Sequence, residues 1–164
     1  LLALNSRFLH GITPGVLDGF TTLEQLNLAN NLITSLPAGL LDDLVALEKL
    51  NLNGNLLARL PARLLWQSPR LESVELSNNQ LQQLAGNLFP AQLSSLRLLR
   101  VDGNALTQLD NRTFTHLSAL TLLDCHDNAI ATLEPDAFFG LSALEQLELH
   151  GNALDELAAA TLQP

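Results

Sequence analysis

Apolar residues recur along the chain in a fixed pattern with a period of 24 or 25 positions. The blocks carry leucine or another apolar residue at positions 0, +3, +5, +10, +13, +18 and +21, and asparagine at +8. Position +21 is Ser68 in the block at Leu47, and its apolar residue falls one position later, at Leu93, in the longer block at Leu71. The blocks begin at Leu23, Leu47, Leu71, Leu96, Leu120 and Leu144, and a truncated repeat over 1–22 precedes them. Because the period runs through residues 1–164, we expect one repeat domain without visible capping segments.

The start of each block predicts a short strand. Leucines alternate with polar residues there, as in Leu26-Asn27-Leu28 and Leu147-Glu148-Leu149, which is the two-residue period of a strand with one buried face. Repeats this short that stack in one direction place their strands in parallel, with the leucines inward. Prolines in Leu36-Pro37 and Leu60-Pro61 predict loops and brief helical turns on the outer side.

One polar column interrupts this apolar pattern at the end of each strand. There the chain turns away from the sheet, and buried backbone groups lose their ladder partners. An asparagine side chain both donates and accepts hydrogen bonds, so we expect a structural ladder along the stack. Its members are Asn31, Asn55, Asn79, Asn104, Asn128 and Asn152.

The outer wall is predicted to be lined by large apolar side chains at position +18. A single extra residue in Pro90-Ala91-Gln92 falls in this wall, where an insertion is tolerated because the strand register is kept. The +18 residues are Leu17, Leu41, Leu65, Phe89, Phe114, Phe138 and Leu162.

Composition and charge restrict the classes of partner that the chain is expected to bind. The chain has 44 leucines among 164 residues and a net charge of −9, so we expect no nucleic-acid partner. No uncharged apolar run approaches the length that spans a bilayer, so we expect no membrane insertion of this segment. With Cys125 as its one cysteine, the chain forms no internal disulfide.

The strings LEQLNLANNLI, LEKLNLNGNLL and LEQLELHGNAL resemble the leucine-rich repeat in its typical 24-residue extracellular subfamily. The resemblance implies an α/β fold: a right-handed solenoid or horseshoe with a concave parallel sheet and a convex side of loops and short helices. It also implies protein recognition, often in innate immunity or adhesion, without catalysis or a cofactor. The cysteine-rich caps usual at both ends of that subfamily are not seen in this sequence.

Positions +2, +4 and +6 of each block lie on its strand or just after it, point away from the core and form the candidate ligand-binding face. With their flanks, these positions hold nine acids and three bases, which favours a protein or peptide ligand of basic character over an inert, solvated face. The candidate residues are Glu75, Leu98, Arg100, Asp102, Leu122, Asp124, His126, Glu148 and His150.

Two groups within this face carry more specific hypotheses. Leu98 and Leu122 are expected to be exposed neighbours and a contact centre, although an ordinary cross-strand apolar pair explains them equally well. Glu75, Arg100 and Asp124 lie in one row and are expected to form modest surface salt bridges.

His126 and His150 share the +6 column beside acidic residues. Their spacing permits a zinc site or a pH-sensitive contact. Ladders of polar residues place like types side by side in any repeat protein, so we interpret the pair as a plain polar ladder and predict no metal site.

The sequence gives no basis for an enzyme. Cys125 should point into the core while His126 points outward, because successive strand residues face opposite sides of a sheet. Separately, Asn111-Arg112-Thr113 is a glycosylation sequon on an expected surface turn, which fits a secreted protein or a surface ectodomain.

These observations leave three functional hypotheses. The first is a recognition module of a secreted or cell-surface protein. The second is a self-assembling scaffold that forms a homodimer through its ends or its sheet face, and the third is an intracellular or bacterial scaffold. Exposed leucines are expected in both terminal turns, up to Leu157 and Leu162. We expect these leucines to be covered by further repeats of a longer chain, in preference to the partner subunit of a dimer.

Overall fold

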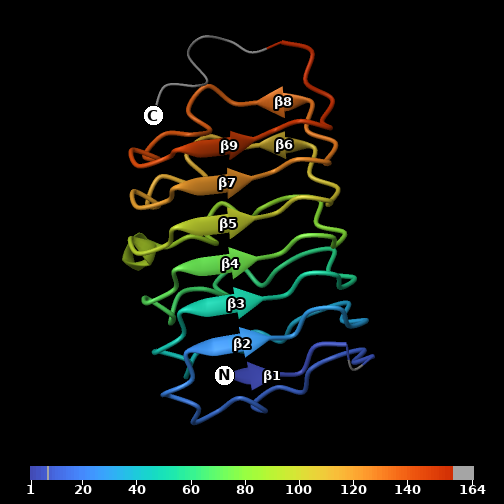
Figure 1. Ribbon diagram of the computed structural model, residues 1–164, viewed down its shortest axis with the longest axis vertical. Coiled ribbons are helices and arrows are strands. Elements are labelled where there is room, and N and C mark those ends of the chain that lie inside the picture. Colours follow the sequence, from blue (N-terminus) through green and yellow to red (C-terminus); the bar gives the residue numbers. More distant parts are fainter. Residues whose placement is uncertain (7, 157–164) are drawn as a thin grey trace.

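The computed structural model describes residues 1–6 and 8–156 and consists of stacked turns of backbone with one strand in each turn (Figure 1). The predictions for Leu157 and Leu162 concern positions outside the described residues. The strands of the main parallel sheet are β1 (Leu2–Ala3), β2 (Gln25–Asn27), β3 (Lys49–Asn51), β4 (Ser73–Glu75), β5 (Leu98–Arg100), β7 (Leu122–Asp124) and β9 (Gln146–Glu148).

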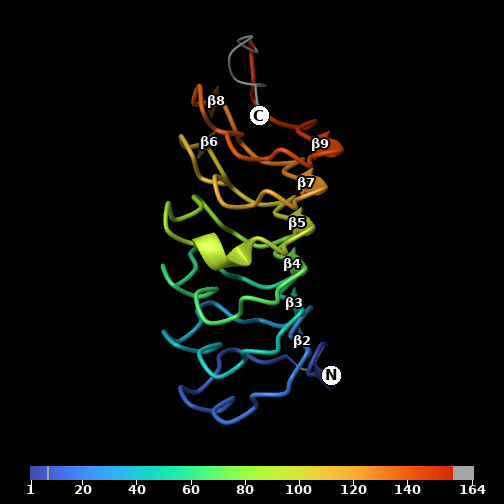
Figure 2. The ribbon, with the colours of Figure 1, turned by 90° about the vertical axis from the view of Figure 1, so that its left-hand side faces the viewer.

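The strands pair in parallel and in the register that the repeat predicts. Leu50 is opposite Leu26 and Val74, and Leu123 is opposite Leu99 and Leu147. The sheet lies along the inner side of a gentle curve (Figure 2), so the predicted solenoid with a concave parallel sheet is confirmed.

The outer wall is made almost wholly of turns. Its one described helix is the 3-10 segment η1 (Ala91–Leu93), in which Leu93 is buried. This segment overlaps Pro90-Ala91-Gln92, where the sequence has one extra residue. Two short strands that the sequence did not predict, β6 (Gln108–Leu109) and β8 (Thr132–Leu133), pair in parallel on the side opposite the main sheet (Figure 2). No helix among the described residues is long and apolar enough to cross a bilayer.

The leucine columns and the outer-wall column form one continuous core. Leu26, Leu50 and Leu99 are almost completely buried, and Phe89 packs on Phe114 with ring centroids 5.8 Å apart. Every described residue of the +18 column is buried, which confirms its predicted place in the core: Leu17, Leu41, Leu65, Phe89, Phe114 and Phe138.

The asparagine column connects neighbouring turns through its side-chain amides. The Nδ2 of Asn79 donates to the carbonyl of Leu76 in its own turn and to that of Leu52 in the preceding turn, both at 3.0 Å. Its Oδ1 accepts from the backbone N–H of Leu57 at 3.1 Å. The same three contacts recur at Asn55, Asn104, Asn128 and Asn152.

A second column, immediately before the asparagines, turns the backbone through left-handed conformations. It alternates between residues with a short polar side chain and glycines. A Cβ at Gly54 would lie 2.5 Å from Oδ1 of Asn30, and one at Gly103 would lie 2.6 Å from Oδ1 of Asn78, so each glycine makes room for the side chain of the turn before it. In chain order the column is Asn30, Gly54, Asn78, Gly103, Asp127 and Gly151, all with positive φ.

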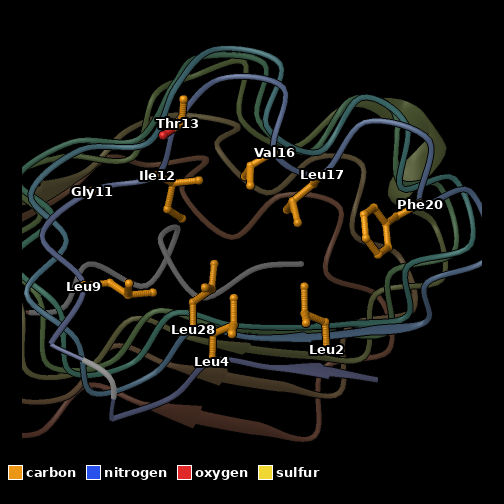
Figure 3. Close-up of a pocket in the computed structure, with 10 residues that line it drawn as sticks. All are labelled: Leu2, Leu4, Leu9, Gly11, Ile12, Thr13, Val16, Leu17, Phe20 and Leu28. Atoms are coloured by element: carbon orange, nitrogen blue, oxygen red, sulfur yellow. The ribbon is translucent and has the colours of Figure 1, made fainter.

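The first turn borders an open apolar pocket of about 250 Å³ (Figure 3). Leu2 and Leu4 enter it from the strand side, and Ile12 and Leu17 enter it from the opposite wall. Leu1, Val16 and Phe20 are exposed, whereas Leu2 and Leu4 are half-buried, so the expected exposure of leucines on this turn is confirmed at Leu1 alone.

Candidate functional site

The outward face of the main sheet collects the predicted ligand-binding residues in three parallel rows. The register places Leu98 beside Leu122, Arg100 beside Asp124, and Asp124 beside Glu148. Rows form because successive turns repeat the same position at the spacing of neighbouring strands, about 4.8 Å. The face is therefore one continuous surface assembled from residues 24 or 25 positions apart.

Leu98 and Leu122 are neighbours, as predicted, but neither is fully exposed. Both side chains are half-buried on the face, so the expectation of an exposed pair is corrected. Cross-strand apolar pairs cover one another in this way, and each lowers the exposed area of the other. They offer a shallow apolar contact surrounded by charged groups.

The predicted salt bridges along the row of Glu75, Arg100 and Asp124 are not found. Glu75 accepts a hydrogen bond from Asn53 Nδ2 at 2.9 Å, and Asp124 pairs with His126. Arg100 is exposed and belongs to none of the ion pairs among the described residues. Its guanidinium is thus available to an incoming group.

The two histidines of the +6 column stack on each other. The ring centroids of His126 and His150 lie 4.5 Å apart with an interplanar angle of 11°. Each ring also contacts an acid two positions earlier on its own strand: Nδ1 of His126 lies 2.6 Å from Oδ1 of Asp124, and Nδ1 of His150 lies 3.2 Å from Oε2 of Glu148.

The acids around His126 favour its protonated form. The hydrogen bond with Asp124 is the main reason that the pKa of His126 is raised. Partial burial opposes this rise, while the charges of Asp124, Asp102 and Asp127 reinforce it. The pair is consequently an electrostatically coupled part of the face.

Two further residues complete this cluster, and the sequence did not single them out. Ser77 Oγ donates to Asp102 Oδ1 at 2.5 Å, and Asp127 Oδ2 lies 3.7 Å from His126 Nε2. Ser77 occupies the +6 position of its turn and Asp127 the +7 position of its own, so their positions at the strand ends were the signal that could have identified them. Asp102, Asp124 and His126 bring their ligand-type atoms within 4.8 Å of one another.

Cys125 lies on the other side of the strand from this cluster. It is completely buried in the core, and burial raises the pKa of its thiol, with the charges of Asp124 and Asp102 adding to the effect. The thiol is therefore protonated and inaccessible, and Cys125 packs as a small apolar side chain.

The sequon lies on an exposed turn. Asn111 is exposed and accepts a hydrogen bond from the Asp136 backbone N–H through Oδ1, at 2.9 Å. Thr113 is buried, and its hydroxyl donates to the carbonyl of Asp110 at 3.0 Å. The Asn111 side chain thus reaches solvent at the edge of the outer wall.

Comparison with known proteins matches this chain to one family model, described as leucine rich repeat, over residues 1–57, 69–124 and 94–154. Among solved structures it is similar to TLR13 in a complex with ssRNA13, at 26% identity and a TM-score of 0.80 over 88% of this chain and 20% of that one. No curated protein sequence matches.

Two other solved structures extend the comparison. Toll of Drosophila, in a glycosylated complex with Spatzle, is 27% identical with a TM-score of 0.76 over 83% of this chain and 20% of that one. A leucine-rich repeat protein of Leptospira interrogans is 28% identical with a TM-score of 0.63 over 86% of this chain and 40% of that one. The chain therefore spans about a fifth of the first two proteins and two fifths of the third.

Proposed function

The chain belongs to the leucine-rich repeat family and resembles innate-immune ectodomains, and from that premise we propose that its concave face binds a cationic protein or peptide. Its role is recognition without catalysis. The observation that carries the proposal is the continuous outward face of a seven-stranded parallel sheet, on which polar, charged and apolar side chains alternate from turn to turn while the core columns stay apolar.

The proposed contact centre is the half-buried pair Leu98 and Leu122, with Arg100 and Asp124 beside it. The apolar pair supplies area that loses water on binding, and the charged neighbours supply orientation. The wider binding surface includes Glu75, Asp102, His126, Glu148 and His150.

Charge supports a polypeptide ligand over a nucleic acid. TLR13 is described in a complex with ssRNA13, so an RNA ligand is the competing proposal for this chain. The binding face and its flanks carry nine acids against three bases, and such a field repels a phosphate backbone. Measuring both ligand classes separates the two proposals.

The test begins with peptides selected on the immobilised protein from a phage-displayed random library. The selected peptides should be rich in lysine and arginine, and their affinity should fall at least tenfold in the triple variant Leu98→Ala, Arg100→Ala, Asp124→Asn. A single-stranded RNA oligonucleotide should not bind at physiological salt. Calorimetry measures both affinities, and circular dichroism confirms that the variants fold.

The matched control replaces three exposed residues of the outer wall: Arg59→Ala, Gln82→Ala and Thr107→Ala. This variant should bind the selected peptides as the unaltered protein does. Loss of binding in the control but not in the triple variant would place the ligand on the outer wall and refute the assignment to the sheet face.

We propose an extracellular location with glycosylation at Asn111, whose side chain is exposed. The glycosylated form of Toll in the comparison supports this location. Expression in a secreting eukaryotic cell should add one glycan that an Asn111→Gln variant lacks, as measured by mass spectrometry. Secreted protein without sugar at Asn111 would favour the intracellular or bacterial scaffold instead.

The apolar surface of the first turn favours one second candidate, a self-associating scaffold. Val16 and Phe20 line the pocket of that turn and are exposed, and Leu1 is exposed on the same turn. Self-association would make the scattering mass rise with protein concentration, whereas a concentration-independent monomer would eliminate this alternative.

A further inference from the structure

The end of strands β5 and β7 on the concave face gathers metal-ligating groups from two neighbouring turns. Asp102 follows β5, Asp124 ends β7, and His126 follows β7. We propose that these three residues bind one divalent transition-metal ion, of which zinc is the representative. This inference does not depend on the proposed peptide ligand.

The distances fit a single ion. Zinc binds carboxylate oxygen and imidazole nitrogen at about 2.0–2.2 Å, so ligands around one ion lie roughly 3 to 4 Å from one another. The ligand-type atoms of Asp102, Asp124 and His126 already lie within 4.8 Å of one another. Small side-chain rotations close the remaining difference, and the backbone stays in place.

The chemistry of the donors selects the kind of metal. An imidazole with two carboxylates suits zinc, nickel or cobalt, whereas magnesium and calcium prefer sites made entirely of oxygen ligands. Three protein ligands on an open sheet face leave a coordination position for water.

The surroundings restrain all three proposed ligands. Asp102 accepts a hydrogen bond from Ser77 Oγ, and the Asp124 side chain is only 12% exposed. The His126 ring is fixed on one face by the stacked ring of His150. Such surrounding contacts orient ligands before the metal arrives and so raise its affinity.

Charge around the cluster also favours a cation. Asp127 and Glu148 add two more carboxylates beside the histidines, and the ion pairs formed in this cluster use only His126 and His150. Arg100 lies in register with Asp124 but is exposed and forms no ion pair among the described residues. A divalent ion would therefore compensate carboxylates that no arginine or lysine neutralises.

Calorimetric titration with zinc chloride tests the site directly. The unaltered protein should bind one zinc ion, and His126→Ala and Asp102→Asn should each weaken binding at least tenfold, because loss of a ligand costs at least as much as loss of a supporting contact. His116→Ala is the matched control, since His116 is exposed on the outer wall and should not affect binding. Magnesium chloride should give no binding heat.

Arg100→Gln supplies a test in the opposite direction. Removing a positive charge beside Asp124 should strengthen zinc binding if the ion occupies the proposed place. Unchanged affinity in Arg100→Gln together with unchanged affinity in His126→Ala would overturn the proposal, as would the absence of zinc binding by the unaltered protein.

Nuclear magnetic resonance keeps the proposal testable if a variant fails to fold. Cobalt is paramagnetic, so a substoichiometric addition to the unaltered protein should broaden the ring signals of His126 and His150 first. Earlier broadening of His10 or His116 would place the metal elsewhere and refute the site.

Discussion

At the residue scale, each ladder asparagine satisfies backbone groups in two successive turns. Replacing Asn79 by leucine leaves the buried N–H of Leu57 without its partner. It also removes one of the two amide donors from the carbonyls of Leu52 and Leu76, which keep only Asn55 and Asn104. Buried polar groups left unpaired are costly, so Asn79→Leu should lower the free energy of unfolding by roughly 1 to 3 kcal/mol.

Urea unfolding followed by circular dichroism measures this loss. Asn87→Leu is the control, because Asn87 is exposed and none of the hydrogen bonds described uses its side chain. The control should change stability by less than about 0.5 kcal/mol. Equal losses in the two variants would show that the ladder contributes nothing particular.

The thiol of Cys125 gives a pH dependence at the same scale. Burial raises the pKa of Cys125 above its ordinary value, so the folded protein keeps a proton that the unfolded chain loses above about pH 8.5. Stability should therefore fall as pH rises beyond that point, by up to about 1.4 kcal/mol per pH unit from this group.

The Cys125→Ala variant isolates that contribution. Its stability should decline less steeply than that of the unaltered protein between pH 8.5 and 10, in denaturant unfolding at each pH. Identical slopes, or rapid modification of the native thiol by an aromatic disulfide reagent, would contradict the burial of Cys125.

The sequence predicted the residues whose positions the repeat determines and missed the pairing of flexible side chains. The positions of Asn79 and Phe114 were predictable, because the strand register and burial allow each of these side chains a single location. The prediction of a salt bridge between Arg100 and Asp124 was wrong, because Asp124 instead contacts the backbone N–H and the ring of His126, two positions further along the chain. A local partner orders fewer side-chain torsions than a long arginine does.

At the scale of elements, the strands and the outer wall respond differently to a change in length. The extra residue near Pro90 is accommodated beside the 3-10 segment η1, while the β4–β5 register is unchanged. The sequence predicted this tolerance and brief helical turns on the outer side. The place of η1 and the β6–β8 pairing were not predictable, because segments of two or three residues are too short to show a helix or strand period.

A further alanine inserted after Gln92 should lower stability by less than about 1 kcal/mol, since a longer surface segment costs little closure entropy. The same alanine inserted after Leu99 in β5 should prevent folding, because a shift of one residue turns the buried positions outward. Circular dichroism and thermal unfolding compare the two variants. Equal tolerance of both insertions would contradict the assigned strand register.

At the scale of the whole molecule, the stability of each turn depends on its contacts with the turns before and after it, because each turn packs only on its neighbours. Phe114 is completely buried and contacts Phe89 of the preceding turn. Phe114→Ala should cost about 3 to 5 kcal/mol. The single tryptophan, Trp66, lies two turns earlier and reports on the other half of the stack.

If the interfaces between turns are strong, Trp66 fluorescence and far-ultraviolet circular dichroism will show the same lowered transition in Phe114→Ala. Phe139→Ala, which changes an exposed ring, is the control and should leave both transitions nearly unchanged. Separate transitions in the two signals would mean that the halves of the stack unfold independently.

The left-handed column sets a rule for lengthening or shortening the protein. Each bulky member, such as Asn30, fits because the next member is a glycine such as Gly54. Excising residues 47–70 would seat Asn78 directly after Asn30 and force two side chains into a space sized for one. Excising residues 47–95 would instead restore the pairing by bringing Gly103 after Asn30. Excising a single coil that carries a glycine thus causes a collision, whereas excising a coil that carries a bulky member, or a dyad of coils, does not. A library of shortened chains should therefore yield little folded protein from members that lack one glycine coil alone.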